Sequence, residues 1–326
     1  MTTKETVLAF LMTHSDDSFS GQKLADQLNI SRNAIWKAIQ TLRNEGYPIE
    51  SVPGVGYRLS EAIDVIDSNV IQSNLTMPLD VTSFPTIDST NTEAKRKLNN
   101  EVEADFLVVA EEQTKGRGRL GRTFYSPAQN GLYMSLVLHD IDSQADSTLI
   151  TTLAAVAVCK AIEELTNQKP QIKWVNDIFL NGKKICGILT EGIINLETQS
   201  IQSIILGIGL NITINEDDLP IELKRIIGSL FEKNEQTYSR NEIAASIINH
   251  FYRLYSTMAT REFMDDYRER CFVLGEDVIF VLQRKRYEGR AIAIDDHGGL
   301  VVKLTDNSEK TLSYGEISIK MKAGES

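Results

Sequence analysis

The run Gly116–Arg122 interleaves three glycines with three arginines, and it follows the apolar, strand-like stretch Phe106–Ala110. Glycine lets the backbone adopt positive φ and approach a ligand closely, and the arginine guanidinium donates paired hydrogen bonds to carboxylates and phosphates. A run of this kind after a buried strand predicts a loop that closes over negatively charged oxygens. A solvated turn or a disordered nucleic-acid-binding segment has a similar composition, so the rest of the chain must distinguish these alternatives.

The composition is that of soluble globular domains. The chain has 326 residues, 42% hydrophobic and 24% charged, enough for two or three domains. Its N-terminus lacks the pattern of a secretory signal, and its apolar stretches are shorter than the roughly 18–20 residues that span a membrane. We therefore expect a cytoplasmic protein with no membrane partner. Cys159, Cys186 and Cys271 are odd in number and widely spaced, which favours free structural thiols over disulfides or a zinc site.

The first sixty residues show a helix-turn-helix pattern rather than a strong positive charge. The formal net charge of the chain is −11, and residues 1–62 carry six basic and seven acidic side chains. Gly21–Leu28 has the pattern of a short helix. Ser31 is a suitable N-cap for a second helix that turns Ile35, Ile39 and Leu42 toward a core.

A hairpin is expected after the second helix. Gly46 should end that helix, and Ile49–Leu59, with Pro53, Gly54 and Gly56 at its tip, should form a β-hairpin wing. Together these elements predict a winged helix-turn-helix whose second helix enters the major groove of DNA. The side chains expected to contact DNA are Ser31, Arg32, Asn33, Trp36 and Lys37.

Two alternatives remain open for this segment. It could be a small helical interaction domain, and Trp36 could pack in the core instead of against DNA. Because the segment carries so little positive charge, a single copy should bind operator DNA weakly. A dimer would double the phosphate contacts.

Strand-like and helix-like segments alternate after a polar boundary at Glu61–Asn69. We expect strands at Val81–Ile87, Phe106–Ala110 and Gly131–Leu138, and a buried helix at Leu149–Leu165. This alternation predicts a second domain of mixed α/β structure.

Small hydroxyl and amide side chains fill Asp88–Glu93, between the first of these strands and the helical segment Ala94–Leu98. The hydroxyls could cap the helix, or they could face a polar ligand. The local pattern does not separate these two roles.

A lysine hairpin is expected further along the chain. Ile172–Ile178 has the pattern of one strand with cationic, aromatic, amide and acidic side chains, and Asn181-Gly182 predicts a tight turn. Lys183 and Lys184 then point to opposite faces of the next strand. Only one of them can reach a pocket, and a lysine that points inward requires an anion.

Five motifs occur in the order and spacing of bacterial biotin protein ligases. With the N-terminal winged helix, essentially the whole chain resembles the bifunctional type that is also the biotin operon repressor. The Gly/Arg run and the lysine hairpin are the most specific features, because a helix-turn-helix fits many regulators. The motifs are Asp88–Asn91, Gly116–Arg122, Lys173–Asp177, Lys184–Gly187 and Gly207–Asn211.

The resemblance implies an α+β chain with three domains. Residues 1–62 would form the winged helix-turn-helix, residues 63–270 a mixed α/β ligase domain of the class II synthetase and biotin/lipoate ligase type, and residues 271–326 an SH3-like β-barrel. Within the last segment, Gly275–Lys320 shows short strands with turns at Asp295–Gly299 and Thr305–Asn307, as a small barrel requires.

The resemblance also implies a reaction and its partners. Biotin and ATP would form biotinyl-5′-AMP, and biotin would then pass to a lysine of the biotin carboxyl-carrier protein of acetyl-CoA carboxylase. Mg²⁺ would accompany ATP, with no metal site built from protein side chains alone. Biotinyl-5′-AMP would act as corepressor of a homodimer that binds operator DNA and represses biotin synthesis and transport genes.

Site residues follow from the same resemblance. Arg119 and Lys184 would bridge the biotin carboxylate and the α-phosphate, and Asp177 would orient or deprotonate the attacking lysine amine. Biotin would be bound by Ser89, Thr90, Asn91, Gln113, Gly116, Arg117, Gly118, Arg119, Lys184 and Gly187. The nucleotide would be bound by Arg119, Arg122, Phe124, Asn176, Lys184, Asn211 and Lys320.

The chain departs from the family pattern at four positions. Val175 stands in place of a proline, Leu120 lies inside the loop, and Phe124 replaces a tryptophan. Lys320 stands where an arginine often reaches the nucleotide. These differences could change nucleotide affinity, but none removes a group that the chemistry requires.

Two other functions remain as alternatives. A lipoate-type ligase shares the catalytic architecture, but such ligases lack this Gly-Arg-Gly-Arg pattern and a winged helix. A regulator that binds a metabolite without chemistry would not need the intact set Arg119, Asn176 and Lys184.

Overall fold

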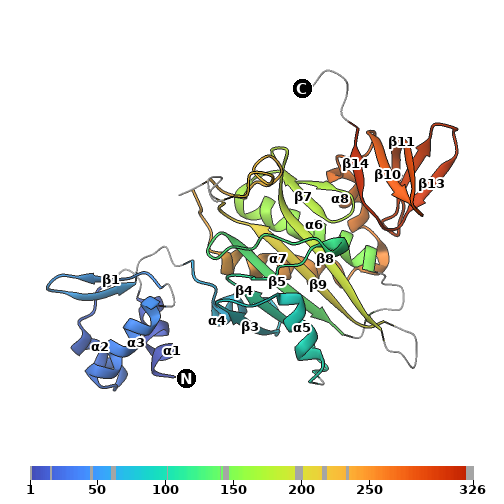
Figure 1. Ribbon diagram of the computed structural model, residues 1–326. Helices are drawn as coiled ribbons and strands as arrows, with labels where there is room; N and C mark the ends of the chain where they lie inside the picture. Colours follow the sequence, from blue (N-terminus) through green and yellow to red (C-terminus); the bar gives the residue numbers. More distant parts are fainter. Residues whose placement is uncertain are drawn as a thin grey trace. The chain divides into compact units, whose positions relative to one another are not determined.

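The computed structural model describes residues 2–14, 17–44, 47–59, 64–100, 102–139, 141, 147–194, 201–214, 219–232 and 235–320. The chain divides into two compact units, Met1–Val65 and Ile66–Ser326, and each is described by itself (Figure 1). Gly46, the expected end of the second helix, and residues 60–63, at the expected boundary, lie outside these ranges. No helix in the described ranges is long and apolar enough to cross a membrane.

The smaller unit has the helices and hairpin that the sequence predicts. Ser31 caps the helix that the sequence predicts after it, here α3, because its hydroxyl accepts a hydrogen bond from the Ala34 N–H at 3.3 Å. Ile35, Ile39 and Leu42 are buried in the core of this unit. The winged helix-turn-helix prediction is confirmed. Its elements are α1 (Thr3–Thr13), α2 (Gly21–Leu28), α3 (Arg32–Asn44), β1 (Ile49–Val52) and β2 (Gly56–Leu59), with β1 and β2 antiparallel.

A mixed sheet forms the centre of the larger unit. Its strand order is β3-β4-β5-β9-β8-β7-β6, in which β3 and β4 are parallel and the other neighbours antiparallel. The strands are β3 (Asp80–Phe84), β4 (Phe106–Ala110), β5 (Gly131–Leu138), β6 (Gln171–Lys173), β7 (Asp177–Leu180), β8 (Lys183–Ile194) and β9 (Ile201–Asn211). The helices are α4 (Ser68–Ser73), α5 (Thr90–Leu98), α6 (Ser147–Thr166), α7 (Arg240–Tyr255) and α8 (Phe263–Arg270), with short 3₁₀ turns η1 (Arg119–Gly121) and η3 (Met258–Thr260).

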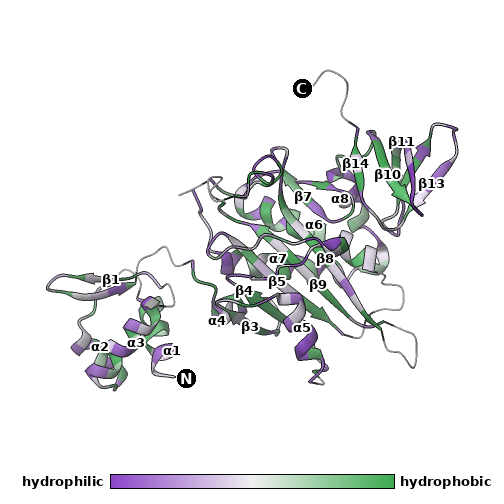
Figure 2. Ribbon diagram, viewed as in Figure 1, coloured by the Kyte–Doolittle hydropathy of each residue, from purple (hydrophilic) through white to green (hydrophobic). Residues whose placement is uncertain are grey.

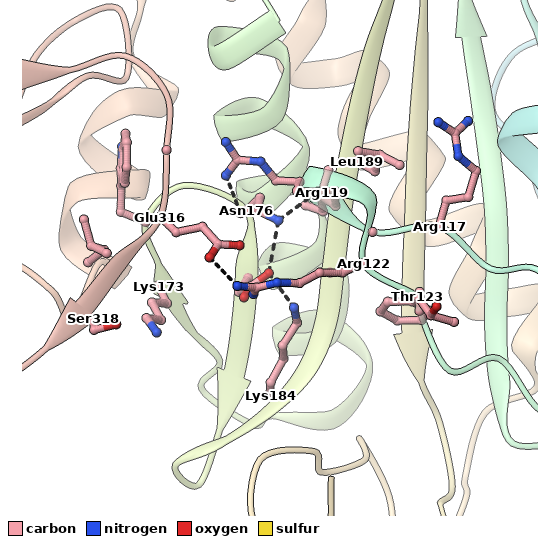
Figure 3. A pocket seen from close by; sticks show the side chains of 18 residues that line it. Arg117, Arg119, Arg122, Thr123, Lys173, Asn176, Lys184, Leu189, Glu316 and Ser318 are labelled. Atoms are coloured by element: carbon pink, nitrogen blue, oxygen red, sulfur yellow. Dashed lines mark hydrogen bonds and ion pairs between the residues drawn. The ribbon is translucent and has the colours of Figure 1, made fainter. Parts of the chain in front are cut away.

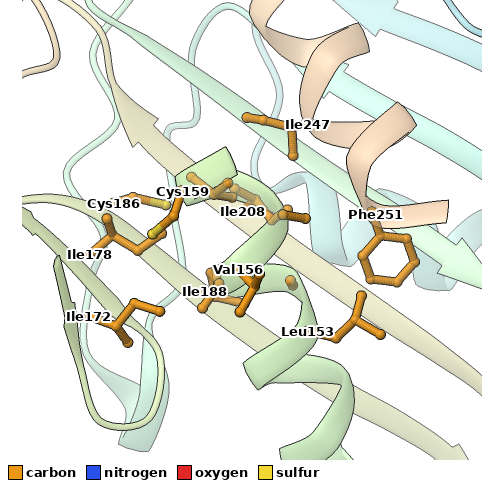
Figure 4. Packing of buried hydrophobic residues seen from close by; sticks show 14 of the residues in the cluster. Leu153, Val156, Cys159, Ile172, Ile178, Cys186, Ile188, Ile208, Ile247 and Phe251 are labelled. Carbon is orange, nitrogen blue, oxygen red and sulfur yellow. The ribbon is translucent and has the colours of Figure 1, made fainter. Parts of the chain in front are cut away.

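Both faces of this sheet are covered. Along β4, Leu107 and Val109 belong to the main core with α6 and α7, whereas Phe106 and Val108 pack with Ala94 of α5. This is why β4 is a continuous apolar run rather than an alternating one. Figure 2 shows hydrophobic residues along these central strands. Figure 4 shows the main core, where Leu153, Val156 and Cys159 of α6 lie among Ile178, Ile188, Ile208, Ile247 and Phe251.

The three cysteines are free and buried, as the sequence predicts. Burial raises the pKa of Cys271 to about 11 and raises the pKa of the Cys159 and Cys186 thiols still further. At neutral pH these side chains therefore remain protonated and act as core residues.

The C-terminal strands form a second, antiparallel sheet with the order β13-β12-β11-β10-β14. The expected turns at Asp295–Gly299 and Thr305–Asn307 connect its strands. The sequence predicts an SH3-like β-barrel here, and the structure confirms a small C-terminal β-sheet domain. The strands are β10 (Asp277–Leu282), β11 (Lys285–Ile294), β12 (Leu300–Leu304), β13 (Glu309–Leu312) and β14 (Ile317–Ile319).

The prediction of one strand at Ile172–Ile178 is wrong. The chain reverses within this segment, and β6 pairs with β7 as an antiparallel hairpin in which Lys173 lies opposite Asp177. The buried Trp174 indole donates a hydrogen bond to the Gly298 carbonyl at 2.8 Å, a contact with the C-terminal sheet that fixes the turn. Local pattern cannot reveal a turn that a distant segment holds in place.

Candidate active site

A polar cavity of about 270 Å³ opens where the Gly/Arg loop, the β6–β7 turn, β8 and the residues before β14 meet (Figure 3). It is called the anion pocket below, because most of its charged side chains are cationic. Its lining consists of Arg117, Gly118, Arg119, Arg122, Thr123, Phe124, Lys173, Trp174, Asn176, Asp177, Lys184, Gly187, Ile188, Leu189, Gly315, Glu316, Ile317 and Ser318.

The Gly/Arg loop folds back on itself before it meets β5. The Phe124 N–H donates to the Gly116 carbonyl at 2.9 Å, and the Gly118 N–H donates to the Arg122 carbonyl at 2.7 Å. A Cβ atom on Gly116 would lie 2.3 Å from the Phe124 carbonyl oxygen, so only glycine fits there. This close approach explains the first glycine of the run.

In the anion pocket, two cationic side chains contact two adjacent residues, an asparagine and an aspartate. Arg119 Nη1 donates to Asn176 Oδ1 at 2.9 Å, and Lys184 Nζ lies 2.7 Å from Asp177 Oδ1. Asn176 Nδ2 also donates to Asp177 Oδ1, at 3.1 Å, which joins the four side chains in one network. The structure therefore brings together Arg119, Lys184, Asn176 and Asp177 as the sequence predicts.

The two lysines of the β7–β8 hairpin face different sides, as expected. Asn181 and Gly182 form the tight turn with φ of 51° and 78°. Lys184 lines the anion pocket, whereas Lys183 lines a separate hollow of about 620 Å³ beside Gly228. The lysine that reaches the pocket is therefore Lys184.

A smaller hollow of about 30 Å³ lies next to the anion pocket, and the two share Arg117, Phe124, Gly187 and Leu189. The Thr90 N–H and hydroxyl both donate to Gln113 Oε1, at 2.9 and 3.1 Å. The smaller hollow is lined by Ser89, Thr90, Asn91, Gln113, Arg117, Phe124, Met134, Gly187, Leu189, Gly207, Ile208 and Gly209.

The sequence left open whether the hydroxyls near the start of α5 cap the helix or face a polar ligand, and the position of Ser89 bears on this choice. It occupies the N-cap position of α5, yet its side chain makes no capping hydrogen bond. It is buried and lines the smaller hollow. Its hydroxyl therefore does not cap the helix, and its contact with a polar ligand stays a prediction.

Asn91 differs from Ser89, because both ends of its amide are bonded to protein. Its Oδ1 lies 2.6 Å from the Ser135 hydroxyl, and its Nδ2 donates to Glu191 at 2.8 Å. A Cβ atom on Gly207 would lie 2.3 Å from Asn91 Oδ1, so Gly207 provides the room for this side chain. Asn91 lines the hollow chiefly as part of its framework.

The Phe124 ring separates the two hollows and lines both. Cβ atoms on Gly187 and Gly209 would lie 3.2 and 2.5 Å from ring carbons of Phe124, so the ring rests on bare backbone of β8 and β9. Its edge meets the Tyr133 ring at a centroid distance of 6.4 Å. Phe124 is among the residues that we expect to bind the nucleotide, and its ring offers a flat aromatic surface for the base.

Two residues expected to bind the nucleotide lie outside both hollows. Asn211 is buried at the end of β9, where its Nδ2 donates to the Gly228 carbonyl at 3.0 Å. Lys320 follows β14, and its Nζ lies 3.1 Å from a carboxylate oxygen of Glu288 in the C-terminal sheet. The family motifs predict that both side chains contact the nucleotide, but in this structure neighbouring segments hold them outside the two hollows.

Glu316 is a pocket residue to which the sequence pattern assigned no role. Its carboxylate lies 2.6 Å from Arg122 Nη2, although the two residues are 194 positions apart. Lys173 likewise lines the anion pocket, with no ion-pair partner among the residues described. Lys173 belongs to the motif Lys173–Asp177, which the sequence singled out for other reasons, whereas Glu316 lies in none of the five motifs.

The smaller unit presents a polar face on α3. Ser31, Arg32, Asn33 and Lys37 are exposed, and Trp36 is 55% exposed. The alternative that Trp36 packs in the core is therefore wrong. All the side chains expected to contact DNA lie on the solvent side of the helix.

Family models match three segments of the chain. Residues 3–58 match an HTH domain, residues 83–211 the biotin/lipoate A/B protein ligase family, and residues 273–320 the biotin protein ligase C terminal domain. A biotin protein ligase from Aquifex aeolicus, solved in complex with biotin and ATP, aligns with a TM-score of 0.63 and 26% identity, over 74% of this chain and 99% of that one.

Curated relatives match along nearly the whole length. The bifunctional ligase/repressor BirA of Bacillus spizizenii is 35% identical over 96% of this chain and 97% of its own. BirA of Escherichia coli is 28% identical, over 92% of each chain. The protein described here belongs to the family of bifunctional biotin ligase/repressors.

Proposed function

We propose that this protein is an ATP-dependent biotin protein ligase that also represses transcription. The observation that carries the ligase function is the convergence of Arg119 and Lys184 on the Asn176–Asp177 pair, beside the hollow around Thr90. A carboxylate and a triphosphate repel each other. Two fixed cations in the anion pocket, which adjoins the smaller hollow, bring them together and stabilise the charge that develops between them.

In the first step, a carboxylate oxygen of biotin attacks the α-phosphorus of ATP. The bond from that phosphorus to the bridging oxygen breaks, and pyrophosphate leaves with the bonding electrons. Arg119 and Lys184 offset the negative charge on the five-coordinate phosphorus, while Asn176 holds the Arg119 guanidinium in place. We assign to Lys173, which lines the same pocket, the role of binding the departing pyrophosphate.

ATP enters this reaction as its magnesium complex. Within the described ranges, no three acidic, histidine or cysteine side chains gather closely enough to hold a metal ion. Mg²⁺ bound with ATP would take ligands from the phosphates of the nucleotide, as is common for this ion. When bound, the ion offsets the charge of the departing pyrophosphate.

In the second step, the amine of a lysine on the biotin carboxyl-carrier protein attacks the acyl carbon of biotinyl-5′-AMP. An amide bond forms, the amine loses a proton, and AMP departs. Both contacts of Asp177 with Lys184 and Asn176 use Oδ1. We assign the remaining oxygen, Oδ2, to orienting the incoming amine.

The exposed face of α3 supports the repressor function. In this proposal biotinyl-5′-AMP is the corepressor, and its binding favours a homodimer that places two copies of α3 on the operator. Two copies double the phosphate contacts, which a segment with so little positive charge needs. Binding at the catalytic unit would then control DNA affinity through an assembly equilibrium.

Intact-mass spectrometry of a biotin carboxyl-carrier domain tests the ligase function. The domain is incubated with this protein, MgATP, and either biotin or lipoate. A gain of one biotin supports the proposal, and a gain with lipoate alone would move the chain to the lipoate side of its family. No gain with either acid would leave a ligand-sensing regulator.

A gel shift tests the repressor function. The probe is a duplex selected from a random library by the protein in the presence of biotin and MgATP. Adding both substrates should move the binding midpoint to lower protein concentration, and sedimentation should show a dimer under the same conditions. An unchanged midpoint would contradict the corepressor role.

A further inference from the structure

The carboxylate of Glu191 on β8 joins three elements around the smaller hollow. It accepts hydrogen bonds from Asn91 Nδ2 and Lys95 Nζ, each at 2.8 Å, and forms an ion pair with the Arg117 guanidinium at 3.1 Å. Asn91 and Lys95 lie one turn apart on α5, whereas Arg117 belongs to the Gly/Arg loop. Glu191 itself lines neither hollow, so any role in the reaction must act through these neighbours.

Glu191 is placed by the strand that also forms the floor of both hollows. Gly187, Leu189 and Glu191 alternate along β8 and so point to one face of the sheet. Gly187 and Leu189 line both hollows, and Glu191 is the next residue on that face, just outside them. Its side chain is 19% exposed, whereas the side chains of Lys95 and Arg117 are 36% and 45% exposed, so solvent partly screens both ion pairs.

The carboxylate of Glu191 is ionised at neutral pH. Burial by itself would raise its pKa, but the hydrogen bonds from Lys95 and Asn91 and the positive charges of Lys95 and Arg117 hold the pKa below its ordinary value. The single negative charge of Glu191 therefore forms ion pairs with Lys95 of α5 and Arg117 of the Gly/Arg loop.

The Gly/Arg loop is fastened through its three arginines. Arg119 contacts Asn176, Arg122 contacts Glu316, and Arg117 contacts Glu191. The first two contacts lie in the anion pocket. Figure 3 shows Arg117 apart from the group around Arg122, Lys184 and Asn176, so its contact secures the other end of the loop.

From this geometry we infer that Glu191 is a positioning residue that fastens the Gly/Arg loop over the bound acyl-adenylate through Arg117. The inference rests on the proposed function, because it concerns retention of the intermediate. Glu191 also keeps the Arg117 guanidinium away from the substrate carboxylate, which leaves that group to Arg119 and Lys184. Loss of the Glu191 charge should speed release of the intermediate more than it slows its formation.

The test is a pulse-chase of the acyl-adenylate on the full-length protein. Wild-type protein and Glu191→Gln are loaded with biotin and radiolabelled MgATP and then diluted into unlabelled substrates, and retained label is followed by filter binding. Release from Glu191→Gln should be about tenfold faster, equivalent to about 1.4 kcal/mol. The single-turnover rate of adenylate formation should change by less than about threefold, a split that general damage to the fold would not produce.

Glu93→Gln is the matched control. It makes the same charge change on α5, but Glu93 contacts Arg96 rather than the loop. Its release rate should equal that of the wild type. Equal acceleration in both variants would mean that overall charge, and not the contact with Arg117, controls release.

Arg117→Gln tests the same contact from the loop side. Arg117 is 45% exposed, so this variant remains informative even if Glu191→Gln fails to fold. It should match the release rate of Glu191→Gln, and the double variant should release no faster than either single one. Wild-type release rates in these variants, or fully additive effects, would overturn the inference. Absence of labelled adenylate on the wild-type protein would instead refute the proposed function.

Discussion

Replacing Lys184 with methionine removes one cation from the anion pocket and keeps a side chain of similar length. In the wild type, Lys184 Nζ lies 2.7 Å from Asp177 Oδ1, and the side chain is 25% exposed. A unit charge about 4 Å from a phosphoryl oxygen interacts by about 4 kcal/mol at an effective dielectric constant of about 20. Removal of one preorganised transition-state contact commonly slows a reaction by about 10²–10³-fold.

Because the Lys184 side chain is partly hydrated, we expect the lower end of that range. Lys184→Met should slow adenylate formation about 100-fold, or about 2.7 kcal/mol. The ion pair with Asp177 is also partly hydrated, so its loss should change the free energy of unfolding by only about 0–1 kcal/mol. A large loss of rate with little loss of stability separates chemistry from folding.

The assay is pyrophosphate release in a single turnover with biotin and MgATP, together with thermal denaturation of each variant. Lys183→Met is the matched control, because Lys183 is the next residue and lines a different hollow. It should keep nearly the wild-type rate. If Lys184→Met retained more than about a third of that rate, or if both variants slowed equally, the assignment of the central cation would be refuted.

Three further predictions concern the nucleotide, DNA and acid stability. Gly209→Ala should weaken ATP binding about tenfold in calorimetry, because its Cβ would lie 2.5 Å from Phe124 Cε1 and displace the ring; an unchanged dissociation constant would contradict the position of Phe124. Trp36→Ala should weaken binding of the selected duplex yet change the free energy of unfolding by less than about 0.5 kcal/mol, because the side chain is 55% exposed; a large drop in melting temperature would place Trp36 in the core. The folded-state pKa of Glu191 lies below its ordinary value, so its stabilising effect is complete above about pH 4.5 and is lost as the pH falls through the folded-state pKa. Glu191→Gln should therefore be less stable than wild type at pH 7, with a difference that shrinks at acid pH in denaturant titrations; a gap that persists at acid pH would contradict the ionised carboxylate.

Local sequence signals predicted elements whose shape depends on their own residues. The helix face with Ile35, Ile39 and Leu42 follows from helical spacing alone, and the Asn181-Gly182 turn follows from two residues that tolerate positive φ. Alternation along β8 likewise predicted that its two lysines face different sides. In each case the deciding interactions lie within a few residues.

Sequence reasoning was wrong where a distant segment sets the local structure. Ile172–Ile178 has the pattern of one strand, but Trp174 donates a hydrogen bond to Gly298 and the chain reverses there. Contacts with Gly228 and Glu288 likewise place Asn211 and Lys320 outside both hollows, and the nucleotide-binding roles that the family motifs imply for them stay predictions. Such contacts have no periodicity, so local pattern does not predict them.

The sequence by itself determined the chemical groups of this protein: a loop of glycines and arginines after a buried strand, a lysine hairpin, and a recognition helix with a polar face. The tertiary structure decided how those groups pair. Each arginine of the loop meets a partner from a different element, and Arg122 meets Glu316 across 194 residues of chain. The physical reason is that residue type and spacing fix which side chains are charged and which face they occupy, whereas the choice of counter-charge depends on which strands and turns pack together.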